Sequence, residues 1–182
     1  MIIAISGPPG SGKTTVSERL AKSKGYEFIS AGADFREMAK DYAKSLEEFG
    51  RYAEDHPDID RDLDARVIRR VEEFTRNGRS VVVDGRLQPW LLQKHGISCF
   101  KVLIDAPLDT RAERIAGREG KGVRQAKNEI RERERSERTR YSKIYGIDVR
   151  DRGVFDLVVD SADKTPEAVV SLVGERVAKW AS

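Results

Sequence analysis

The sequence predicts an α/β fold in which a five-stranded parallel sheet lies between two layers of helices. Short runs of consecutive apolar residues, many of them β-branched, are typical of strands that are buried on both faces of a parallel sheet. These runs alternate with longer stretches whose apolar residues recur at helical spacing. Such an alternation within 182 residues, without a linker or low-complexity tract, predicts a single domain over residues 1–182.

The pattern places each element in order. Strands are expected at residues 2–5, 28–29, 80–84, 100–105 and 154–160. Helices are expected at about residues 13–22, 32–44, 45–54, 59–76, 122–144 and 166–180. Pro57 separates the third and fourth of these helices, because proline is poorly tolerated in a helix interior, and Asp58 is expected to cap the fourth. In the last helix Val169, Leu172 and Val173 share one side, which predicts packing against the sheet.

Composition excludes several classes of protein. No stretch approaches the roughly 20 consecutive apolar residues of a membrane span, so we expect a soluble cytoplasmic protein with no membrane partner. The only cysteine, Cys99, has no partner for a disulfide, which fits a reducing compartment. Because Cys99 lies in an apolar stretch, we expect a buried structural thiol.

The net charge of +3 is unevenly distributed. Residues 30–76 carry 9 Lys or Arg against 13 Asp or Glu, whereas residues 111–140 carry 11 against 6. A basic segment of this size could bind nucleic acid, a membrane surface or small polyanions such as nucleotides, and charge alone does not choose among them. It could equally be a solvated helix face with many internal ion pairs.

A phosphate-binding loop is the strongest signal in the sequence. Residues 7–14 match G-x-x-x-x-G-K-[ST] in full, between a predicted strand and a predicted helix. Glycines let backbone N–H groups turn toward a phosphate, the start of the helix favours an anion, and the lysine reaches the β- and γ-phosphates. The predicted ATP-binding residues of this loop are Gly7, Pro8, Pro9, Gly10, Ser11, Gly12, Lys13, Thr14 and Thr15.

A site for Mg²⁺ is expected beside this loop. The hydroxyl group of Thr14 is the expected ligand from the loop. Asp84 ends the strand at 80–84 and is placed to support the metal directly or through water, since ligands gather at the carboxyl ends of parallel strands. Asp105, which ends the next strand, is a rival, and we favour Asp84 because Arg86 follows it closely.

The remaining motifs favour a small-molecule kinase over other nucleotide-binding classes. An Asn-Lys-x-Asp guanine-reading motif is missing, and translocating ATPases usually need a longer chain. A kinase needs a second anion site for its acceptor and a cationic clamp over the transferred group. Motifs along essentially the whole chain resemble the nucleoside monophosphate kinases of the P-loop fold, most closely archaeal cytidylate kinases. These motifs are the P-loop at 7–15, Ile-Ser-Ala-Gly-x-x-Phe-Arg at 29–36, His-Pro-x-Ile-Asp at 56–60, Asp-Gly-Arg-Leu at 84–87, Arg-Ala-Glu-Arg-Ile at 111–115 and Arg-Tyr-x-x-Ile-Tyr-Gly-Ile-Asp at 140–148.

The resemblance implies an acceptor site and its residues. Residues 31–76 would form a helical insert that binds the nucleoside monophosphate, and Ser30, Gly32 and Arg36 would hold its phosphate. Arg86 would contact the acceptor nucleotide, and Asp60 could accept a hydrogen bond from the cytosine amino group. Near alternatives for Asp60 are Asp58, Asp62 and Asp64.

Residues 118–140 are expected to form a lid. A helix of 100° per residue places Arg133, Glu137 and Arg140 on one face, with Arg131, Arg135 and Arg138 opposite. The first face should turn inward, because Ile130, Tyr141 and Ile144 lie beside it. The resemblance then implies that Arg133 and Arg140 contact the phosphates in transit and that Glu137 contacts the acceptor.

Arg114 and Arg118, four residues apart on one helix, precede the lid. By resemblance Arg114 would stack on the adenine of ATP and Arg118 would contact its phosphates. Their alternative role is i to i+4 support for Glu113 and Glu119.

The expected reaction transfers the γ-phosphoryl group of Mg·ATP to CMP, and to dCMP, with Lys13, Arg133 and Arg140 as catalytic residues. We expect a monomer without a stable nucleic-acid partner. One rival is a kinase for UMP, AMP or a small hydroxyl metabolite, for which Asp34 is available as a base. A second rival is a nucleotide-dependent RNA-binding or regulatory protein that uses the basic segment on phosphate backbone.

Overall fold

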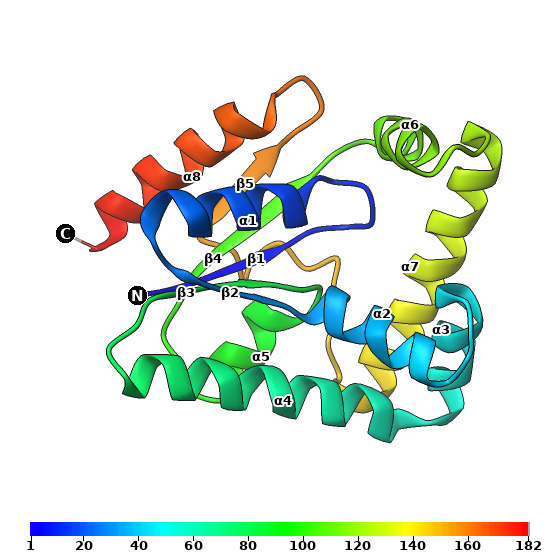
Figure 1. Cartoon of the computed structure of the whole chain (residues 1–182), viewed down its shortest axis with the longest axis horizontal. Coiled ribbons are helices and arrows are strands. Elements are labelled where there is room, and N and C mark those ends of the chain that lie inside the picture. Colours follow the sequence, from blue (N-terminus) through cyan, green and yellow to red (C-terminus); the bar gives the residue numbers. More distant parts are fainter. Residues whose placement is uncertain (182) are drawn as a thin grey trace.

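The computed structural model describes residues 1–181 as alternating strands and helices (Figure 1). The strands are β1 (Ile2–Ser6), β2 (Glu27–Ser30), β3 (Val81–Asp84), β4 (Phe100–Asp105) and β5 (Leu157–Asp160). The helices are α1 (Lys13–Lys24), α2 (Ala31–Asp41), α3 (Leu46–Asp55), α4 (Pro57–Arg76), α5 (Gln88–Lys94), α6 (Leu108–Glu119), α7 (Val123–Tyr145) and α8 (Pro166–Ala181).

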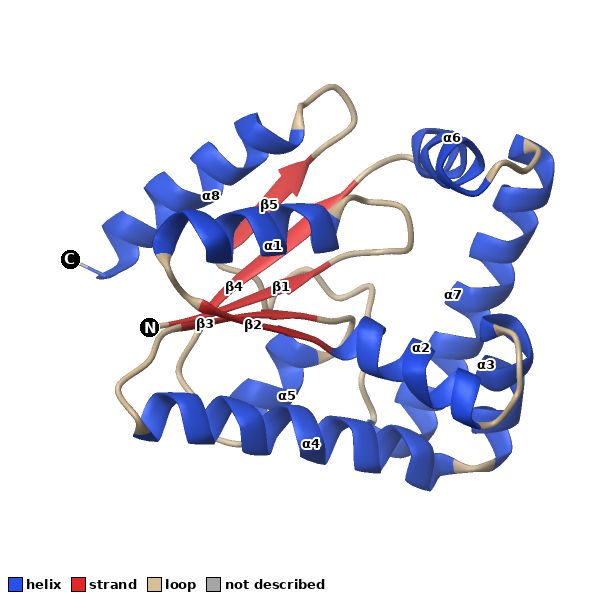
Figure 2. Ribbon diagram, in the orientation of Figure 1, coloured by secondary structure: helices blue, strands red, loops and turns tan. Residues whose placement is uncertain are grey.

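The five strands form one parallel sheet in the order β2-β3-β1-β4-β5, which confirms the predicted fold class. Figure 2 shows α1 and α8 over one face and α4 and α5 over the other, so the fold has three layers. All strands run the same way, so their carboxyl ends meet at one edge of the sheet. The loop after β1, Asp84 at the end of β3 and Ser30 at the end of β2 therefore lie together.

The hydrophobic core has two halves, one on each face of the sheet. Ile3, Ile5 and Val82 pack with α1 and α8 on one face. Ala4 and Val83 pack with α4 and α5 on the other. Adjacent residues of a strand point to opposite faces, and both faces are buried, which explains why the strands are continuous apolar runs. Cys99 belongs to the second half as a free buried thiol, and burial raises its pKa to about 11.

Helices α2, α3, α6 and α7 stand beyond the carboxyl edge of the sheet, and the N-terminal end of α4 extends toward them (Figure 1). A smaller cluster centred on Phe49 joins α2, α3 and α4. Ser136 on α7 donates a hydrogen bond to the carbonyl oxygen of Gly50 on α3 at 3.2 Å. The structure therefore joins the predicted insert and the predicted lid through α3 and α7, while their division at 31–76 and 118–140 stays a prediction.

Several element boundaries differ from the expectation. Helix α4 begins at Pro57, and His56 is at the N-cap position without a side-chain cap, so the prediction that Asp58 caps this helix was wrong. Proline suits the first position of a helix because its missing N–H would have no partner there. Helix α2 ends at Asp41 rather than 44, since Ala43 adopts a positive φ of 51°. Helix α5 was not predicted.

The last strand is shorter than predicted, beginning at Leu157 rather than at 154. Before it, Asp156 pairs with Lys101 through both its backbone N–H and its side-chain carboxylate.

Among residues 1–181, no helix is long and apolar enough to cross a membrane.

Candidate active site

The loop between β1 and α1 has the tight backbone that a phosphate cradle requires. Gly10 and Gly12 adopt φ angles of 83° and 88°, which side chains rarely allow. A Cβ atom on Gly7 would lie 2.1 Å from the carbonyl oxygen of Ile104, so only glycine fits there. The backbone N–H groups at the start of α1 are consequently available to an anion.

Lys13, the first residue of α1, lies half-buried at the base of this loop. Burial lowers its pKa from 10.5 to about 8, an effect that Asp84 opposes and Arg133 reinforces. The ammonium group thus lies in a site where its charge is poorly solvated. An anionic phosphate bound against it would stabilise the charged form.

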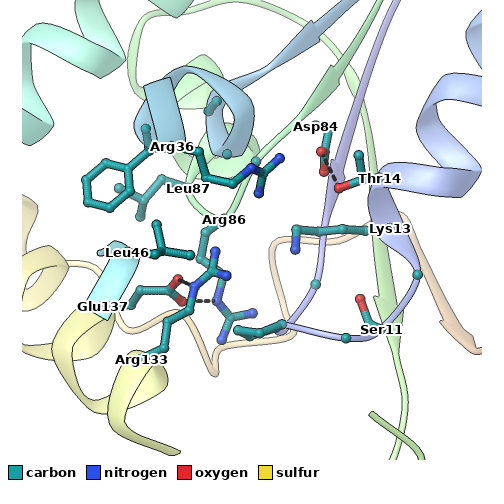
Figure 3. A pocket seen from close by; sticks show the side chains of 18 of the residues that line it. Ser11, Lys13, Thr14, Arg36, Leu46, Asp84, Arg86, Leu87, Arg133 and Glu137 are labelled. Carbon is teal, nitrogen blue, oxygen red and sulfur yellow. Dashed lines mark hydrogen bonds and ion pairs between the residues drawn. The ribbon is translucent and has the colours of Figure 1, made fainter. Parts of the chain in front are cut away.

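Thr14 and Asp84 form the pair expected to support a metal. The Thr14 hydroxyl group donates to Asp84 Oδ2 at 2.7 Å (Figure 3). The Ser30 hydroxyl group donates to the same oxygen at 3.1 Å. Asp84 Oδ1 is buried without a hydrogen-bond partner. Asp105, by contrast, forms an ion pair with Arg152 and accepts a hydrogen bond from the Ala106 N–H. Asp84 is therefore better placed than Asp105 beside the phosphate loop.

The residues present fit a Mg²⁺ ion that is bound largely through phosphates. A hydroxyl oxygen and a carboxylate oxygen are hard ligands of the kind that Mg²⁺ prefers, and Mg²⁺ usually takes few protein ligands in kinase sites. Within residues 1–181, no three His, Cys, Asp or Glu side chains are grouped so as to hold a metal alone.

A second group of cations faces the phosphate loop across the pocket. Arg36 comes from α2, Arg86 from the turn after β3 and Arg133 from α7, and their charged ends gather around one space with Lys13 (Figure 3). Glu137 lies among them and is only 4% exposed. Its carboxylate accepts a hydrogen bond from Arg133 Nε at 3.0 Å and lies 3.3 Å from Arg86 Nε.

The charge of Glu137 depends on these neighbours. Burial by itself would raise the pKa of Glu137, but Arg133, Arg86 and Lys13 together lower it. Glu137 is therefore an anion that neutralises part of the cationic cluster when no substrate phosphate is bound.

Arg140 is engaged in a way that the sequence did not predict. Its Nη1 donates to both carboxylate oxygens of Asp60, at 2.6 and 2.8 Å, in a pair that is almost fully buried. The guanidinium group also lies over the Phe35 ring, 5.0 Å from its centre. Arg140 Nε has no hydrogen-bond partner, so one edge of the group is unsatisfied. The two residues were predicted separately, for catalysis and for base contact, and the structure joins them.

The predicted faces of α7 are confirmed. Glu137 and Arg140 are buried, and Arg133 is partly buried toward the pocket. The residues expected on the opposite face, Arg131, Arg135 and Arg138, are exposed.

Arg114 and Arg118 lie at the other end of the pocket. Arg114 donates to Ser161 O at 2.6 Å, to Ser161 Oγ at 3.0 Å and to Ser11 O at 3.3 Å. Ser161 Oγ also donates to Ser11 O at 2.9 Å, so this serine, which sequence reasoning missed, braces the phosphate loop. Arg118 is exposed and forms an ion pair with Glu119.

Arg111 is a second residue that sequence reasoning missed. It is buried and donates to the carbonyl oxygens of Pro9, at 3.0 Å, and Ala106, at 2.9 Å. It also donates to Glu134 Oε1 on α7 at 2.8 Å. One side chain thus connects the phosphate loop, the end of β4 and the lid helix. The basic motif at 111–115 held the signal, but helical spacing alone does not show that the first arginine turns inward.

The phosphate loop and the cluster of Arg36, Arg86 and Arg133 line one pocket of about 480 Å³, whereas Arg111 and Glu134 lie outside its lining. Of the predicted site residues, Pro8 and Ser30 do not line it, although Ser30 contacts Asp84. The predicted residues that line the pocket are Gly7, Pro9, Gly10, Ser11, Gly12, Lys13, Thr14, Thr15, Gly32, Arg36, Asp60, Asp84, Arg86, Arg114, Arg118, Arg133, Glu137 and Arg140.

The same pocket holds every buried side-chain polar atom that lacks a hydrogen-bond partner among residues 1–181. These atoms are Ser11 Oγ, Asp84 Oδ1, Arg86 Nε, Glu137 Oε2 and Arg140 Nε. Arg86 Nε and Glu137 Oε2 form an ion pair with each other at 3.3 Å, which leaves Ser11 Oγ, Asp84 Oδ1 and Arg140 Nε without such a partner. Unsatisfied buried polar atoms are rare in folded proteins, and their concentration here indicates a polar, charged ligand.

Comparisons with known proteins agree with this geometry. The model of the cytidylate kinase-like family matches residues 2–163. The cytidylate kinase of Pyrococcus abyssi is 43% identical over 173 residues, covering 95% of this chain and 91% of that protein. The cytidylate kinases of Natronomonas pharaonis and Methanocaldococcus jannaschii are 42% and 41% identical, covering 100% and 97% of this chain and 91% and 97% of those proteins.

Solved structures support the fold. An uncharacterised protein from Eubacterium ventriosum has a TM-score of 0.72 at 18% identity, covering 98% of both chains. Shikimate kinase from Aquifex aeolicus has a TM-score of 0.58 at 23% identity, covering all of this chain and 98% of that one.

Proposed function

The chain belongs to the cytidylate kinase-like family, and from this membership we propose that it transfers the γ-phosphoryl group of ATP to CMP, and to dCMP. The products are ADP and CDP or dCDP. Family membership and the names of relatives that match nearly the whole chain support an ATP-dependent nucleoside monophosphate kinase.

One observation carries the proposal. The pocket places a phosphate loop opposite a separate cluster of Arg36, Arg86 and Arg133, so two anionic groups can bind face to face. A nucleotide hydrolase needs only the first site, whereas a kinase with a phosphate acceptor needs both.

The reaction follows from this arrangement. An oxygen of the CMP phosphate attacks the γ-phosphorus of ATP, the new P–O bond forms, the bond to the β–γ bridging oxygen breaks, and ADP leaves. Because the acceptor oxygen is already anionic, no strong base is required. The transferred group needs stabilisation of its negative charge, which we assign to Lys13 and Arg133.

Arg140 keeps its proposed catalytic role in a modified form. Asp60 holds the Nη1 side of the guanidinium group, and the unsatisfied Nε side is the part that can contact a phosphate. Asp60 would then position Arg140 and keep it charged. Acceptor binding is assigned to Arg36, Arg86, Gly32 and Ser30 as predicted.

Mg²⁺ is the proposed cofactor. Thr14 and Asp84 would hold it beside the ATP phosphates, where it would neutralise developing charge. We assign Arg114 and Arg118 to ATP, because Arg114 donates to Ser11 O of the phosphate loop and both arginines line the pocket.

The rival functions have less support. A hydroxyl acceptor needs a positioned base, and Asp34 is instead paired with Arg70 at 3.1 Å, outside the pocket lining. In the basic segment, Arg111, Arg114 and Arg140 are already engaged within the protein, which argues against its use as an RNA-binding surface.

The test is a coupled assay with Mg·ATP and a panel of CMP, dCMP, UMP, AMP and GMP. We expect CMP and dCMP to give the highest kcat/KM. Faster turnover of AMP or UMP would assign a different acceptor, and salt-sensitive RNA binding without phosphoryl transfer would overturn the proposal.

A further inference from the structure

Two carboxyl groups lie one helical turn apart on α4 and both face the pocket. Asp60 is 2% exposed and Asp64 is 7% exposed, whereas Asp58 and Asp62 on the same helix are exposed. Four aspartates at alternate positions thus divide into two in the site and two in solvent.

Asp60 is already committed to Arg140. Both of its oxygens accept hydrogen bonds from Arg140 Nη1, and the pair is buried beneath the Phe35 ring. Separating them would leave two unpaired buried charges, which is strongly unfavourable. Asp60 is therefore a poor candidate for a residue that exchanges its partner for a substrate group.

Asp64 is free of such a partner. It accepts a hydrogen bond at 2.6 Å from the hydroxyl group of Tyr145 on α7, and Gln88 on α5 also hydrogen-bonds to it. Asp64 and Gln88 line the pocket, but Tyr145 does not, so Tyr145 holds the carboxyl group from behind.

The environment of Asp64 favours a neutral carboxyl group. Its pKa is raised to about 7, chiefly by burial and also by the charge of Asp60, while Tyr145, Gln88 and Arg140 oppose the shift. A protonated carboxyl group offers one donor and one acceptor side by side.

Tyr145 determines which oxygen is the acceptor. Burial and the neighbouring Asp64 raise the pKa of Tyr145, so its hydroxyl group keeps its proton and donates to Asp64 Oδ2. Lys94, the nearby cation of α5, lies over the Tyr145 ring at 6.0 Å from its centre. A proton on Asp64 is then best placed on Oδ1, with Oδ2 left as an acceptor.

We infer that Asp64 reads the base of the acceptor nucleotide and that Tyr145 acts as the positioning residue that sets its hydrogen-bonding polarity. The inference rests on the proposed function and names the specificity group of that same site. Cytosine presents N3 as an acceptor beside the N4 amino donor, which complements Oδ1–H and Oδ2. Uracil presents a donor at N3 and an acceptor at O4. The Oδ1–H group would then face another donor and Oδ2 another acceptor, which disfavours uracil.

The experiment compares kcat/KM for CMP and for UMP between about pH 6 and 9 in the wild type and four variants. Asp64→Asn carries a donor and an acceptor at every pH. Asp64→Leu removes both the donor and the acceptor. Tyr145→Phe removes the hydroxyl group that donates to Asp64 Oδ2, and Asp62→Asn is a matched exposed control on the same helix.

For the wild type we expect the ratio of CMP to UMP kcat/KM to fall as pH rises through about 7, because the neutral carboxyl group is lost. D64N should keep the preference and lose its pH dependence. D64L should lose about tenfold in kcat/KM for CMP and most of the preference. Y145F should lower the ratio of CMP to UMP kcat/KM while its thermal unfolding stays cooperative. D62N should have the same ratio and the same pH dependence as the wild type.

The outcomes separate the two proposals. A wild type that phosphorylates no CMP overturns the proposed function and the inference together. A wild type that phosphorylates CMP, with D64L keeping the full preference, overturns only the inference. Should D64L fail to fold, D64N supplies the test. A ratio of CMP to UMP kcat/KM that depends on pH in D64N as it does in the wild type overturns the inference.

Discussion

At the scale of a single residue, the proposed activity depends most directly on the charge of Lys13. Lys13 is half-buried, and its pKa is lowered to about 8, chiefly because loss of solvation disfavours the charge. Below about pH 8 the free enzyme therefore carries the cation that the phosphates need, and above this pH the cation is progressively lost. Bound ATP should raise the pKa again, since a phosphate favours the charged form.

We accordingly expect kcat/KM for ATP to decline as pH rises above about 8, while kcat declines only at higher pH. Lys13→Ala should reduce turnover by roughly a thousandfold without loss of the fold, because it removes phosphate contact and a poorly solvated charge. Lys22→Ala, an exposed lysine on the same helix, is the matched control. Steady-state kinetics across this pH range measure both effects, and a K13A enzyme with wild-type turnover would refute the assignment.

Glu137 shows how one anion organises several cations. Its hydrogen bond from Arg133 and its ion pair with Arg86 draw together side chains from α7 and from the turn after β3. Without such a counter-ion the arginines would repel one another. Under the proposed function, a substrate phosphate would bring its own charge and leave Glu137 to contact the acceptor, as the resemblance implies.

At the scale of elements, α7 connects the parts of the site. Its inner face reaches α3 through Ser136, α4 through Arg140 and Tyr145, and the phosphate loop through Glu134 and Arg111. Gly120 and Gly146 end α6 and α7 in the left-handed conformation. A movement of α7 would therefore alter both nucleotide subsites together.

Arg111 provides the test of this connection. We expect Arg111→Met to raise KM for ATP about tenfold and to lower the free energy of unfolding by about 2–4 kcal/mol, because it leaves the Pro9 and Ala106 carbonyl groups and Glu134 unpaired. Arg135→Met, which changes an exposed arginine on α7, should alter neither quantity by much. Steady-state kinetics and denaturant unfolding supply the measurements. An R111M enzyme with a normal KM for ATP would show that the phosphate loop does not need the hydrogen bonds from Arg111.

At the scale of the whole molecule, two ligands should stabilise the protein more than the sum of their separate effects. Under the proposed function, the acceptor contacts would come from α2, α4 and the turn after β3, and those for ATP from α1 and α6, with α7 between them. A ligand at 100 times its Kd adds about 2.7 kcal/mol to stability, which for a chain of this size raises Tm by roughly 5–10 °C.

Scanning calorimetry with CMP, with a non-hydrolysable ATP analogue, and with both will measure this coupling. We expect the Tm shift with both ligands to exceed the sum of the single shifts, because the first ligand orders α7 for the second. Strictly additive shifts would indicate two independent subsites.

Much of this fold follows from local patterns. The strand at 2–5, the phosphate loop and the helix after it are contiguous, and their geometry depends on nearby glycines and apolar spacing. The inward face of α7 was also predictable, because helical periodicity sorts its arginines. The errors at Asp58 and at the start of β5 concern element ends: Pro57 occupies the first position of α4, and Lys101 on β4 holds Asp156 just before β5.

The sequence by itself determined the parallel α/β architecture, the phosphate loop and the set of charged residues available to a kinase. The tertiary structure alone decided which of these charges meet. Arg140 and Asp60 are separated by 80 residues, and Arg111 and Pro9 by 102, so no local spacing could pair them. Partners in a buried site are chosen by how distant elements pack, because a charge removed from water must find its counterpart wherever the fold brings one within reach.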